Sequence, residues 1–355
     1  MDKDLLLAID VGTGSVRAAL ITRKGETLAF SAKEHDQIVL PAVRPTIYFV
    51  GVTTSKSSIR RIFPLWAEYL GLRDAEIKGI DFPLQAEPAA YRQVVEFIKN
   101  DPLSAGALVT THKIDLFNSC WHIFDEIDPF AQLMGETSCI SKASGRLVCH
   151  AKDPIPSGLA LASFLPNNHW ATTGADVFVM GAGGSAIAVT WHLALSDAVR
   201  ETANRPSRII ISDRSQLRLT EIRRIHAESG VDIPVEYLLV PKQIENDAIL
   251  NRLKPGSLVV NATGLGKDSP GSPITQAGHF PEQGVVWELN YRGELLFLDQ
   301  ARTQEAERHL QIEDGWTYFI HGWTRVIAEV FHINIPVGGP VFDHLSELAI
   351  RYGKP

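Results

Sequence analysis

Short apolar runs alternate with polar turns and amphipathic segments along most of the chain. The first unit starts at Thr46, where the run IYFVGV precedes the polar turn TTSKSS and an amphipathic segment from Ile59 to Leu70 that Gly71 closes. The same order begins again at GALVTTHK. Repeated units of strand, turn and helix predict an α/β layer with parallel strands.

The pattern becomes clearer from Asp176 onward. A strand, a Gly-rich turn and a helix are predicted over VFVMGAGGSAIAVTWHLA, and further apolar runs of strand length follow in RIIISDRS, VEYLLV, SLVVNATG and GVVWELNY. Continuous apolar runs of this length are typical of strands covered on both faces. We therefore expect a doubly wound sheet in which VFVM and RIIIS are adjacent parallel strands.

The chain, at 355 residues, is long enough for two domains with separate cores. We expect one domain at 46–158 and a second at 159–310. Bulky residues at helical spacing between Asp314 and Phe331 predict that residues 311–355 form helices that return to the first of these domains.

The first 36 residues follow a different pattern. The runs LLLAID, VRAALIT and TLAFSA are separated by glycine turns, which predicts a β-meander. Two prolines stand in the segment 37–45 that follows, and we interpret this segment as a linker.

Composition and charge disfavour several classes of protein. The formal net charge of -7 disfavours a nucleic-acid-binding surface, which needs clustered Lys and Arg. The three cysteines, Cys120, Cys139 and Cys149, form no C-x-x-C pair, so we predict neither a disulfide framework nor a metal site, and the reducing cytoplasm fits best. The N-terminus lacks the basic flank of a signal peptide, and no stretch reaches the ~18 apolar residues of a membrane span.

A glycine-rich turn stands between a predicted strand and a predicted helix. It contains Gly181, Gly183 and Gly184, and Ser185 and Ala186 follow. A dinucleotide pyrophosphate binds to backbone N–H groups at a helix N-terminus, and glycines allow it to approach closely. An ordinary turn is the alternative, but the order of strand, turn and helix favours a dinucleotide cofactor.

The next predicted strand ends at Asp213, Arg214 and Ser215. In a dinucleotide-binding fold, this strand end contacts the adenosine ribose of the cofactor. A carboxylate there accepts hydrogen bonds from the 2′-hydroxyl of NAD and repels the 2′-phosphate of NADP, whereas Arg214 and Arg218 favour that phosphate. We expect NAD, because an acidic group at the strand end usually decides by charge repulsion, and NADP stays open. A solvated turn in which Asp213 caps the next helix is the other interpretation.

Lys113 ends the apolar run GALVTTHK, at the mouth of the first α/β layer. A lysine near a cofactor is able to act as general acid and base between an alcohol and a ketone if burial and a neighbouring group tune its ammonium. A surface lysine is the alternative, and spacing alone favours it.

Six motifs occur in one order along the chain. They are Ser55-Lys56-Ser57 after a strand, VTTHK, Asp153 after GRLVCHAK, GAGGSA, Asn261-Ala262-Thr263-Gly264 and Glu288-Leu289-Asn290-Tyr291. In this order the motifs resemble those of the shikimate dehydrogenase family, which includes the quinate/shikimate dehydrogenases, and the resemblance runs from Thr46 to the C-terminus. It implies an α/β substrate domain joined to a Rossmann-type cofactor domain. The implied activity is NAD(P)-dependent oxidation of a secondary alcohol of a hydroxylated cyclic or sugar-like acid, with reversible reduction of the 3-keto form.

The resemblance also implies roles for single residues. Lys113 and Asp153 correspond to the catalytic pair, in which the carboxylate holds the lysine that exchanges a proton with the carbinol. The residues implied in binding an acidic small-molecule substrate are Ser55, Ser57, Thr110, Ser138, Tyr291 and His321. Asn261, Ala262, Thr263 and Gly264 correspond to the segment that borders the nicotinamide. We expect a monomer or a homodimer.

Several positions depart from the family pattern. The segment 108–113 is one residue shorter than N-V-T-x-P-x-K and lacks its asparagine and proline. Ser138 stands in place of a substrate-binding asparagine, and His321-Gly322 in place of a glutamine; the stretch N-P-I-x-H is missing. We infer that the proton and hydride chemistry is kept and that recognition of the substrate ring is altered.

The first 35 residues, which contain the stretch from Leu5 to His35, are similar to the start of the FGGY carbohydrate kinases, where Asp10 and Gly12-Thr13-Gly14 would serve the ATP phosphates. Nothing later in the chain supplies the second phosphate motif of such a kinase. We interpret residues 1–36 as a kinase-like fragment without kinase activity. The alternative function is a kinase-derived or non-catalytic ligand-binding fusion protein, but the joint presence of Lys113 and Asp153 favours the enzyme.

Overall fold

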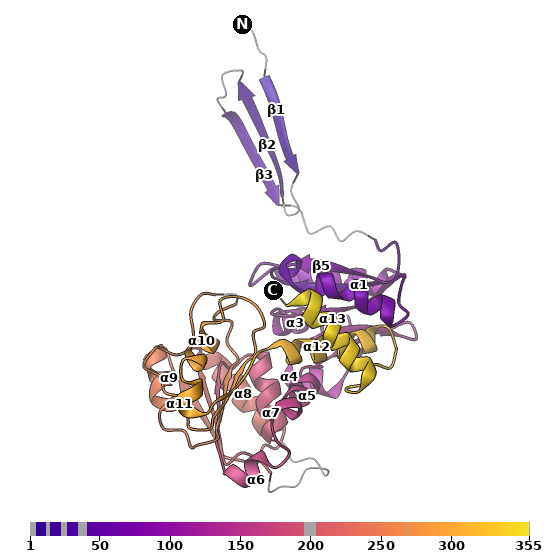
Figure 1. Ribbon diagram of the computed structural model, residues 1–355. Helices are drawn as coiled ribbons and strands as arrows, with labels where there is room; N and C mark the ends of the chain where they lie inside the picture. The colour runs from indigo at the N-terminus through magenta and orange to yellow at the C-terminus, as the bar shows by residue number, and fades with distance from the viewer. Residues whose placement is uncertain are drawn as a thin grey trace.

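A computed structural model describes residues 5–11, 15–22, 27–34, 41–194, 204–267 and 269–354. Figure 1 shows an α/β architecture, and the described strands form two six-stranded sheets and one three-stranded sheet. The two large sheets, called here the first and the second sheet, carry the residues that the six motifs single out.

The first sheet has the strand order β5-β4-β6-β8-β9-β7. The bounds are β4 (Thr46–Gly51), β5 (Glu76–Asp81), β6 (Ser104–Val109), β7 (Glu126–Ile127), β8 (Cys139–Ala143) and β9 (Arg146–His150). Strand β4 pairs in parallel with β6, as expected for the predicted layer, and also with β5, whereas β8 is antiparallel to both β6 and β9. The turn Ser144-Gly145 joins β8 to β9 with both φ angles positive, and so short a connection cannot cross over to a parallel strand.

The helices around this sheet follow the predicted pattern. They are η1 (Thr54–Lys56), α1 (Ile59–Tyr69), α2 (Pro88–Asn100), α3 (Lys113–Cys120), α4 (Pro129–Met134), α5 (Pro154–Phe164) and α6 (His169–Thr173). Helix α1 ends where predicted, because Gly71 adopts φ +78, a left-handed conformation that favours glycine. It buries its apolar face, including Ile62 and Trp66, against the sheet and the C-terminal helices.

The second sheet has the order β12-β11-β10-β13-β14-β15, and every pairing in it is parallel. The bounds are β10 (Val177–Met180), β11 (Ile209–Asp213), β12 (Val235–Leu239), β13 (Leu258–Asn261), β14 (Val285–Glu288) and β15 (Gln311–Glu313). The adjacent parallel pair β10 and β11 confirms the predicted doubly wound sheet. Because β10 lies between β11 and β13, the strand order reverses beside it, and such switch points are where α/β folds bind ligands.

Five helices follow the strands of the second sheet, and two more close the chain. The five are α7 (Gly184–Ala194), α8 (Gln216–Glu228), α9 (Gln243–Leu250), α10 (Leu296–Arg302) and α11 (Glu305–Arg308). The last two, α12 (Trp316–Val330) and α13 (Pro340–Gly353), return to the first sheet. Trp316 and Trp323 share a core with Ile47 and Phe49 of β4, and the Trp66 indole donates to the Leu345 carbonyl at 2.8 Å. The C-terminal helices thus pack on the first sheet, and their assignment to a substrate domain stays a prediction.

The N-terminal sheet is an antiparallel meander of β1 (Leu5–Val11), β2 (Ser15–Thr22) and β3 (Thr27–Glu34), which confirms the predicted strand pattern. The turn Gly12-Thr13-Gly14, to which the kinase resemblance assigned a phosphate role, lies outside the described residues. No helix among the described residues is long and apolar enough to cross a membrane.

Candidate active site

A pocket lies between the two large sheets, where segments that follow β6, β9, β13 and β14 meet the start of α7 and the inner face of α12. From the side of the first sheet, its lining includes Ser57, Thr110, Lys113, Glu136, Ser138, Lys152 and Asp153. From the second sheet and α12 it includes Gly184, Ser185, Arg218, Ala262, Thr263, Gly264, Tyr291 and Tyr318. Twelve of the residues singled out in the sequence therefore meet around one cavity.

Lys113 and Asp153 form an ion pair inside this pocket. Lys113 is the first residue of α3, Asp153 precedes α5, and only 15% and 14% of their side chains are exposed. The Tyr318 hydroxyl from α12 donates to the same Asp153 oxygen at 3.3 Å. Burial by itself would lower the pKa of Lys113, but the carboxylates of Asp153 and Glu136 outweigh it and raise that pKa above its usual range.

This direction changes the role that the lysine is able to play. The sequence led us to expect that burial and a neighbouring group tune this ammonium, so that a lysine paired to a carboxylate exchanges a proton with the carbinol. The two carboxylates beside Lys113 favour its ammonium form. It is therefore suited to donate a hydrogen bond to a carbinol or carbonyl oxygen and to stabilise negative charge there.

The short loop before Lys113 is a strained turn. Thr111 has φ +62, which is an outlier for a β-branched residue, and the His112 amide donates back to the Thr110 carbonyl at 2.6 Å. The buried His112 ring bonds the Tyr91 hydroxyl at 2.8 Å, which fixes the loop from below. A segment one residue shorter than the family pattern thus still delivers Lys113 to the pocket.

The paired serines of the first motif are placed differently from each other. Ser57 is 5% exposed and lines the pocket, and its hydroxyl lies 3.0 Å from the Tyr291 hydroxyl. Ser55 is exposed and does not line the pocket, because the single turn of η1 directs the two residues apart. Of the two serines, only Ser57 is placed in the pocket, beside Tyr291, so the expected substrate contact stays a prediction for Ser57 and loses its basis for Ser55.

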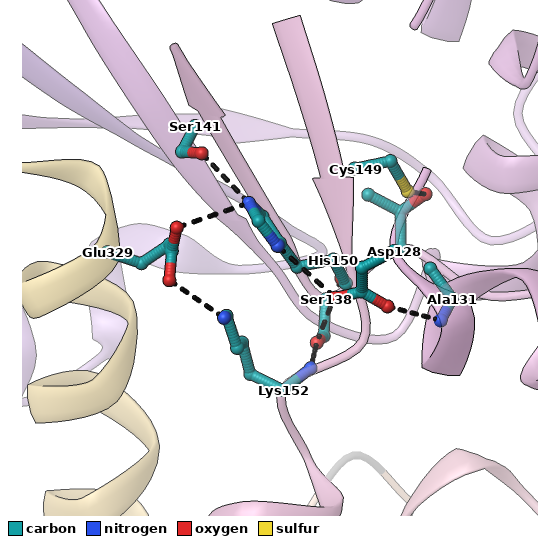
Figure 2. Close-up of polar contacts among 9 residues, drawn as sticks. Asp128, Ala131, Ser138, Ser141, Cys149, His150, Lys152 and Glu329 are labelled. Carbon is teal, nitrogen blue, oxygen red and sulfur yellow. Dashed lines mark hydrogen bonds and ion pairs between the residues drawn. The ribbon is translucent and has the colours of Figure 1, made fainter. Parts of the chain in front are cut away.

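Ser138 and Lys152 belong to a polar network beneath the pocket, which Figure 2 shows. The Ser138 hydroxyl accepts a hydrogen bond from the Lys152 amide at 2.7 Å, and the Lys152 ammonium donates to Glu329 of α12 at 2.8 Å. The His150 ring lies between Asp128, Ser141 and Glu329, at 3.2, 2.8 and 3.5 Å. This network fixes Lys152 as a second cation on the first-sheet side of the pocket.

His321 does not reach the pocket. Its ring is buried and stacks on Phe342 with ring centroids 4.4 Å apart, and burial lowers its pKa to about 4. The next residue, Gly322, lines the pocket instead. The implied substrate contact of His321 is therefore corrected: at this point α12 presents backbone to the pocket.

The glycine-rich turn has the geometry that a dinucleotide requires. Gly181 adopts φ +105, and a Cβ at Gly183 would meet open space, so the backbone is accessible where α7 begins. Gly184 and Ser185 line the pocket, whereas Gly181, Gly183 and Ala186 do not. The turn is thus able to bind a pyrophosphate through N–H groups at the start of α7.

Asp213 closes the far side of this turn. Its carboxylate accepts hydrogen bonds from the amides of Ala182 and Ser215, both at 2.8 Å, and Ser215 caps α8 through Arg218. Each oxygen keeps a lone pair for a ribose hydroxyl. Asp213, Arg214 and Ser215 lie outside the pocket lining, and Arg218 is part of it. The predicted cofactor residues therefore stand in two layers, one that faces the pocket and one that supports the turn.

The first prediction concerns cofactor choice. We expect NAD to bind at least as tightly as NADP, and Asp213→Asn to raise the affinity for NADP by roughly tenfold, because the amide removes the repulsion of a 2′-phosphate and keeps one acceptor for the loop. Titration of both dinucleotides by protein fluorescence measures the ratio. An unchanged ratio in the variant would show that Asp213 does not read the 2′ position.

The segment after β13 is supported by a buried carboxyl group. Glu288 accepts from the side chain of Asn261 at 2.6 Å and from the Asn290 amide at 2.8 Å, and burial raises its pKa to about 8. Asn261 in turn accepts from the Thr263 amide at 3.0 Å. Asn261 therefore supports this segment through hydrogen bonds without lining the pocket, and Ala262, Thr263 and Gly264 line it.

Among the lining residues that the sequence analysis did not single out are Glu136, Lys152 and Tyr318. Lys152 directly precedes the candidate catalytic residue Asp153, and this position could have indicated it from the sequence. Tyr318 stands in the predicted C-terminal helix, where bulky residues suggested only packing. Glu136 lies in a loop without periodicity, and nothing in its local sequence indicates a site.

Comparisons with known proteins agree with this geometry. No protein-family model matches the sequence. The chain is 24% identical over 230 residues to a shikimate dehydrogenase (NADP(+)) of Lactococcus lactis, covering 64% of this chain and 74% of that protein. It is 29% identical over 184 residues to a shikimate dehydrogenase (NADP(+)) of Streptococcus thermophilus, covering 52% of this chain and 59% of that protein.

Among solved structures, the quinate dehydrogenase of Corynebacterium glutamicum, determined in complex with NAD, is similar with a TM-score of 0.65 at 16% identity. That match covers 87% of this chain and 99% of the quinate dehydrogenase. Over the part of the chain that this match covers, the fold is therefore that of the quinate dehydrogenase.

Proposed function

We propose that the protein is an NAD(P)-dependent dehydrogenase that oxidises a secondary alcohol of a hydroxylated cyclic or sugar-like acid and reduces the ketone in the reverse direction. The ion pair of Lys113 and Asp153 carries this proposal, because it lies in a pocket whose opposite wall is the start of α7. A non-catalytic binding module would have no need of a buried ammonium held by a carboxylate. Nicotinamide, when bound, accepts or supplies the hydride.

The protein's own groups divide the remaining work. Ser57 and Tyr291 stand together as hydroxyl donors, and Lys152 supplies a cation on the same side, so these three groups suit the substrate carboxylate. Lys113 is placed to donate to the reacting oxygen, and Asp153 and Tyr318 hold its orientation. The altered residues at Ser138 and His321-Gly322 support a substrate whose hydroxyl pattern differs from that of shikimate.

The wider assignments belong to the same proposal. Residues 46–158 would form the substrate domain and residues 159–310 the cofactor domain, with 311–355 packed on the former. We propose a cytoplasmic enzyme that works as a monomer or homodimer on a small acidic substrate.

A substrate screen tests the proposal. Hydroxylated cyclic acids, including shikimate and quinate, and sugar acids are offered with NAD and with NADP, and the absorbance of the reduced nicotinamide is followed. We expect oxidation of at least one acid. Absence of both turnover and dinucleotide binding across the panel would refute the dehydrogenase assignment.

The second prediction concerns the carboxylate anchor. Ser57→Ala is expected to raise KM for the acidic substrate by roughly tenfold with kcat within about twofold, because one hydrogen bond to a charged group is lost in ground state and transition state alike. Ser55→Ala is the matched control and should behave like the parent, since Ser55 is exposed and outside the pocket. Equal effects of the two variants would contradict the placement.

A further inference from the structure

Helix α12 turns one face toward the pocket, and the middle of that face is apolar. The residues of α12 that line the pocket are Tyr318, Phe319, Gly322, Trp323 and Val326. Their spacing alternates between one and three residues, which keeps them on one side of the helix. At one end Tyr318 donates to Asp153, and beyond the other end Glu329 pairs with Lys152. Between these polar ends the side chains are hydrocarbon, apart from the indole nitrogen of Trp323.

The first sheet supplies a matching apolar surface. Phe49 of β4 and Leu108 of β6 are register partners on neighbouring parallel strands, so their side chains lie on the same face of the sheet. Both line the pocket, and the Phe49 ring meets the Trp323 indole edge to face with ring centroids 5.0 Å apart. The apolar surface continues to Tyr291, whose ring lies 4.3 Å from that of Phe319. A molecule bound at the Tyr291 hydroxyl therefore lies beside hydrocarbon.

Gly322 leaves open space in this apolar wall. A Cβ built on Gly322 would meet no heavy atom within 4 Å apart from its chain neighbours and the backbone of its own helix. Gly322 has no positive φ, and it stands in the interior of α12, where glycine costs stability relative to alanine. Neither the backbone conformation nor close packing therefore requires glycine at this position. Because Gly322 lines the pocket, the space beside it is available to a bound molecule.

A hydroxyl group and a methyl group of similar size would bind differently in this space. A hydroxyl group buried against Phe49, Leu108 and Val326 finds no hydrogen-bond partner among their side chains, and an unpaired buried hydroxyl costs free energy. A methyl group carries no such cost, and its burial tightens binding by roughly fourfold. The apolar residues thus select by polarity, and Gly322 selects by size.

We propose that the preferred substrate carries an alkyl substituent on the side of its ring that faces Gly322, in place of the further hydroxyl groups of shikimate. This inference rests on the proposed dehydrogenase function and names its substrate class, a cyclic hydroxy acid with one carboxylate, one secondary alcohol and a hydrocarbon body. The carboxylate binds at Ser57 and Tyr291, and the alcohol oxygen lies at Lys113. Gly322 is then a specificity-determining residue of this reaction.

The test uses acids that share one ring: 3-hydroxycyclohexanecarboxylate, its 4-methyl and 5-methyl derivatives, and 3,4,5-trihydroxycyclohexanecarboxylate. Each acid is offered with NAD and with NADP to the parent, to Gly322→Leu and to the control Gly338→Leu, which changes an exposed glycine outside the pocket. For the parent we expect kcat/KM of at least one methylated acid to exceed that of the unsubstituted acid by roughly fourfold and that of the trihydroxy acid by at least roughly tenfold.

The variants separate size from polarity. Gly322→Leu fills the open space, so it should lower kcat/KM for the methylated acid by at least roughly tenfold and leave the unsubstituted acid within about threefold. Val326→Thr adds a hydroxyl group without changing the size of the side chain, so it should reduce the preference for the methylated over the trihydroxy acid by at least roughly threefold. Gly338→Leu should match the parent on every acid.

A further variant checks that the space beside Gly322 is open. Alanine is a better helix former than glycine, and its Cβ meets no neighbour there, so Gly322→Ala should melt at or above the temperature of the parent. A lower melting temperature would show that the space is occupied by the protein itself and would overturn the inference.

The kinetic outcomes are equally decisive. Preference of the parent for the trihydroxy acid, or equal losses on methylated and unsubstituted acids in Gly322→Leu, would overturn the inference and leave the dehydrogenase function intact. Oxidation of shikimate, quinate or a sugar acid but of none of these methylated acids would do the same. If the parent oxidises no acid at all and binds neither dinucleotide, the dehydrogenase function is refuted and the inference about its substrate falls with it.

Discussion

Replacement of Lys113 by alanine is expected to lower kcat for the identified acid by at least about 100-fold, with dinucleotide affinity little changed. The reason is electrostatic. Lys113 is the one cation between Asp153 and Glu136, and its ammonium is placed to stabilise charge that develops on the reacting oxygen. Alanine leaves two buried carboxylates facing that oxygen, which repel the same charge. Steady-state kinetics and fluorescence titration of the dinucleotide measure the two quantities.

The controls separate chemistry from folding. Lys56→Ala removes an exposed lysine from the neighbouring η1 and should leave kcat at the parent value. Loss of a buried ion-pair partner also destabilises a protein, so the circular dichroism spectrum and melting temperature of Lys113→Ala must be compared with those of the parent. A folded Lys113→Ala variant with parent-like turnover would end the proposed mechanism.

The sequence predicted strands most successfully where every residue of the strand is buried. Strands β10, β11, β13 and β14 are buried along their whole length, and each was predicted from an unbroken apolar run. Strand β5 was not predicted, because its residues are mostly half-buried and its sequence EIKGID mixes charge with glycine. Strand β15 has three residues and carries no periodicity of its own. Such edge strands depend on the neighbour that they pair with, which a local pattern does not reveal.

The site was predictable where strand ends determine it. Lys113 and Asp153 follow strands of one sheet, so they were expected to converge, and the ion pair between them meets that expectation. Details that depend on rotation by one residue were not predictable. On α12 a step of one residue turns the side chain by about 100°, which sends His321 toward Phe342 and leaves Gly322 at the pocket.

Glu136 shows a different limit. Its position opposite Gly184 arises from packing between segments 48 residues apart in the chain, and no spacing rule connects a loop glutamate to a glycine turn. The place of Glu136 in the pocket could therefore be found only from the three-dimensional arrangement.

Gly181→Ala is expected to have the largest effect on the cofactor side of the pocket. Gly181 has φ +105, which an alanine adopts only under strain, and the added Cβ would lie 2.8 Å from the Ala262 carbonyl oxygen and 3.2 Å from the Thr263 amide nitrogen. The substitution must push the segment 262–263 away from β10, and that segment borders the pocket. We expect the free energy of unfolding to fall by about 2 kcal/mol and the affinity for NAD to fall by at least roughly tenfold.

Gly183→Ala separates these causes, because Gly183 has no positive φ and a Cβ there would meet nothing within 4 Å. Its thermal stability without dinucleotide should equal that of the parent, so any loss of NAD affinity would come from blocked approach of the pyrophosphate alone. Denaturant unfolding of both apoproteins and titration with NAD give the comparison. Parent-like unfolding of Gly181→Ala would show that the added Cβ does not displace the segment 262–263. Parent-like NAD affinity would show that the dinucleotide does not bind between the turn at Gly181 and that segment.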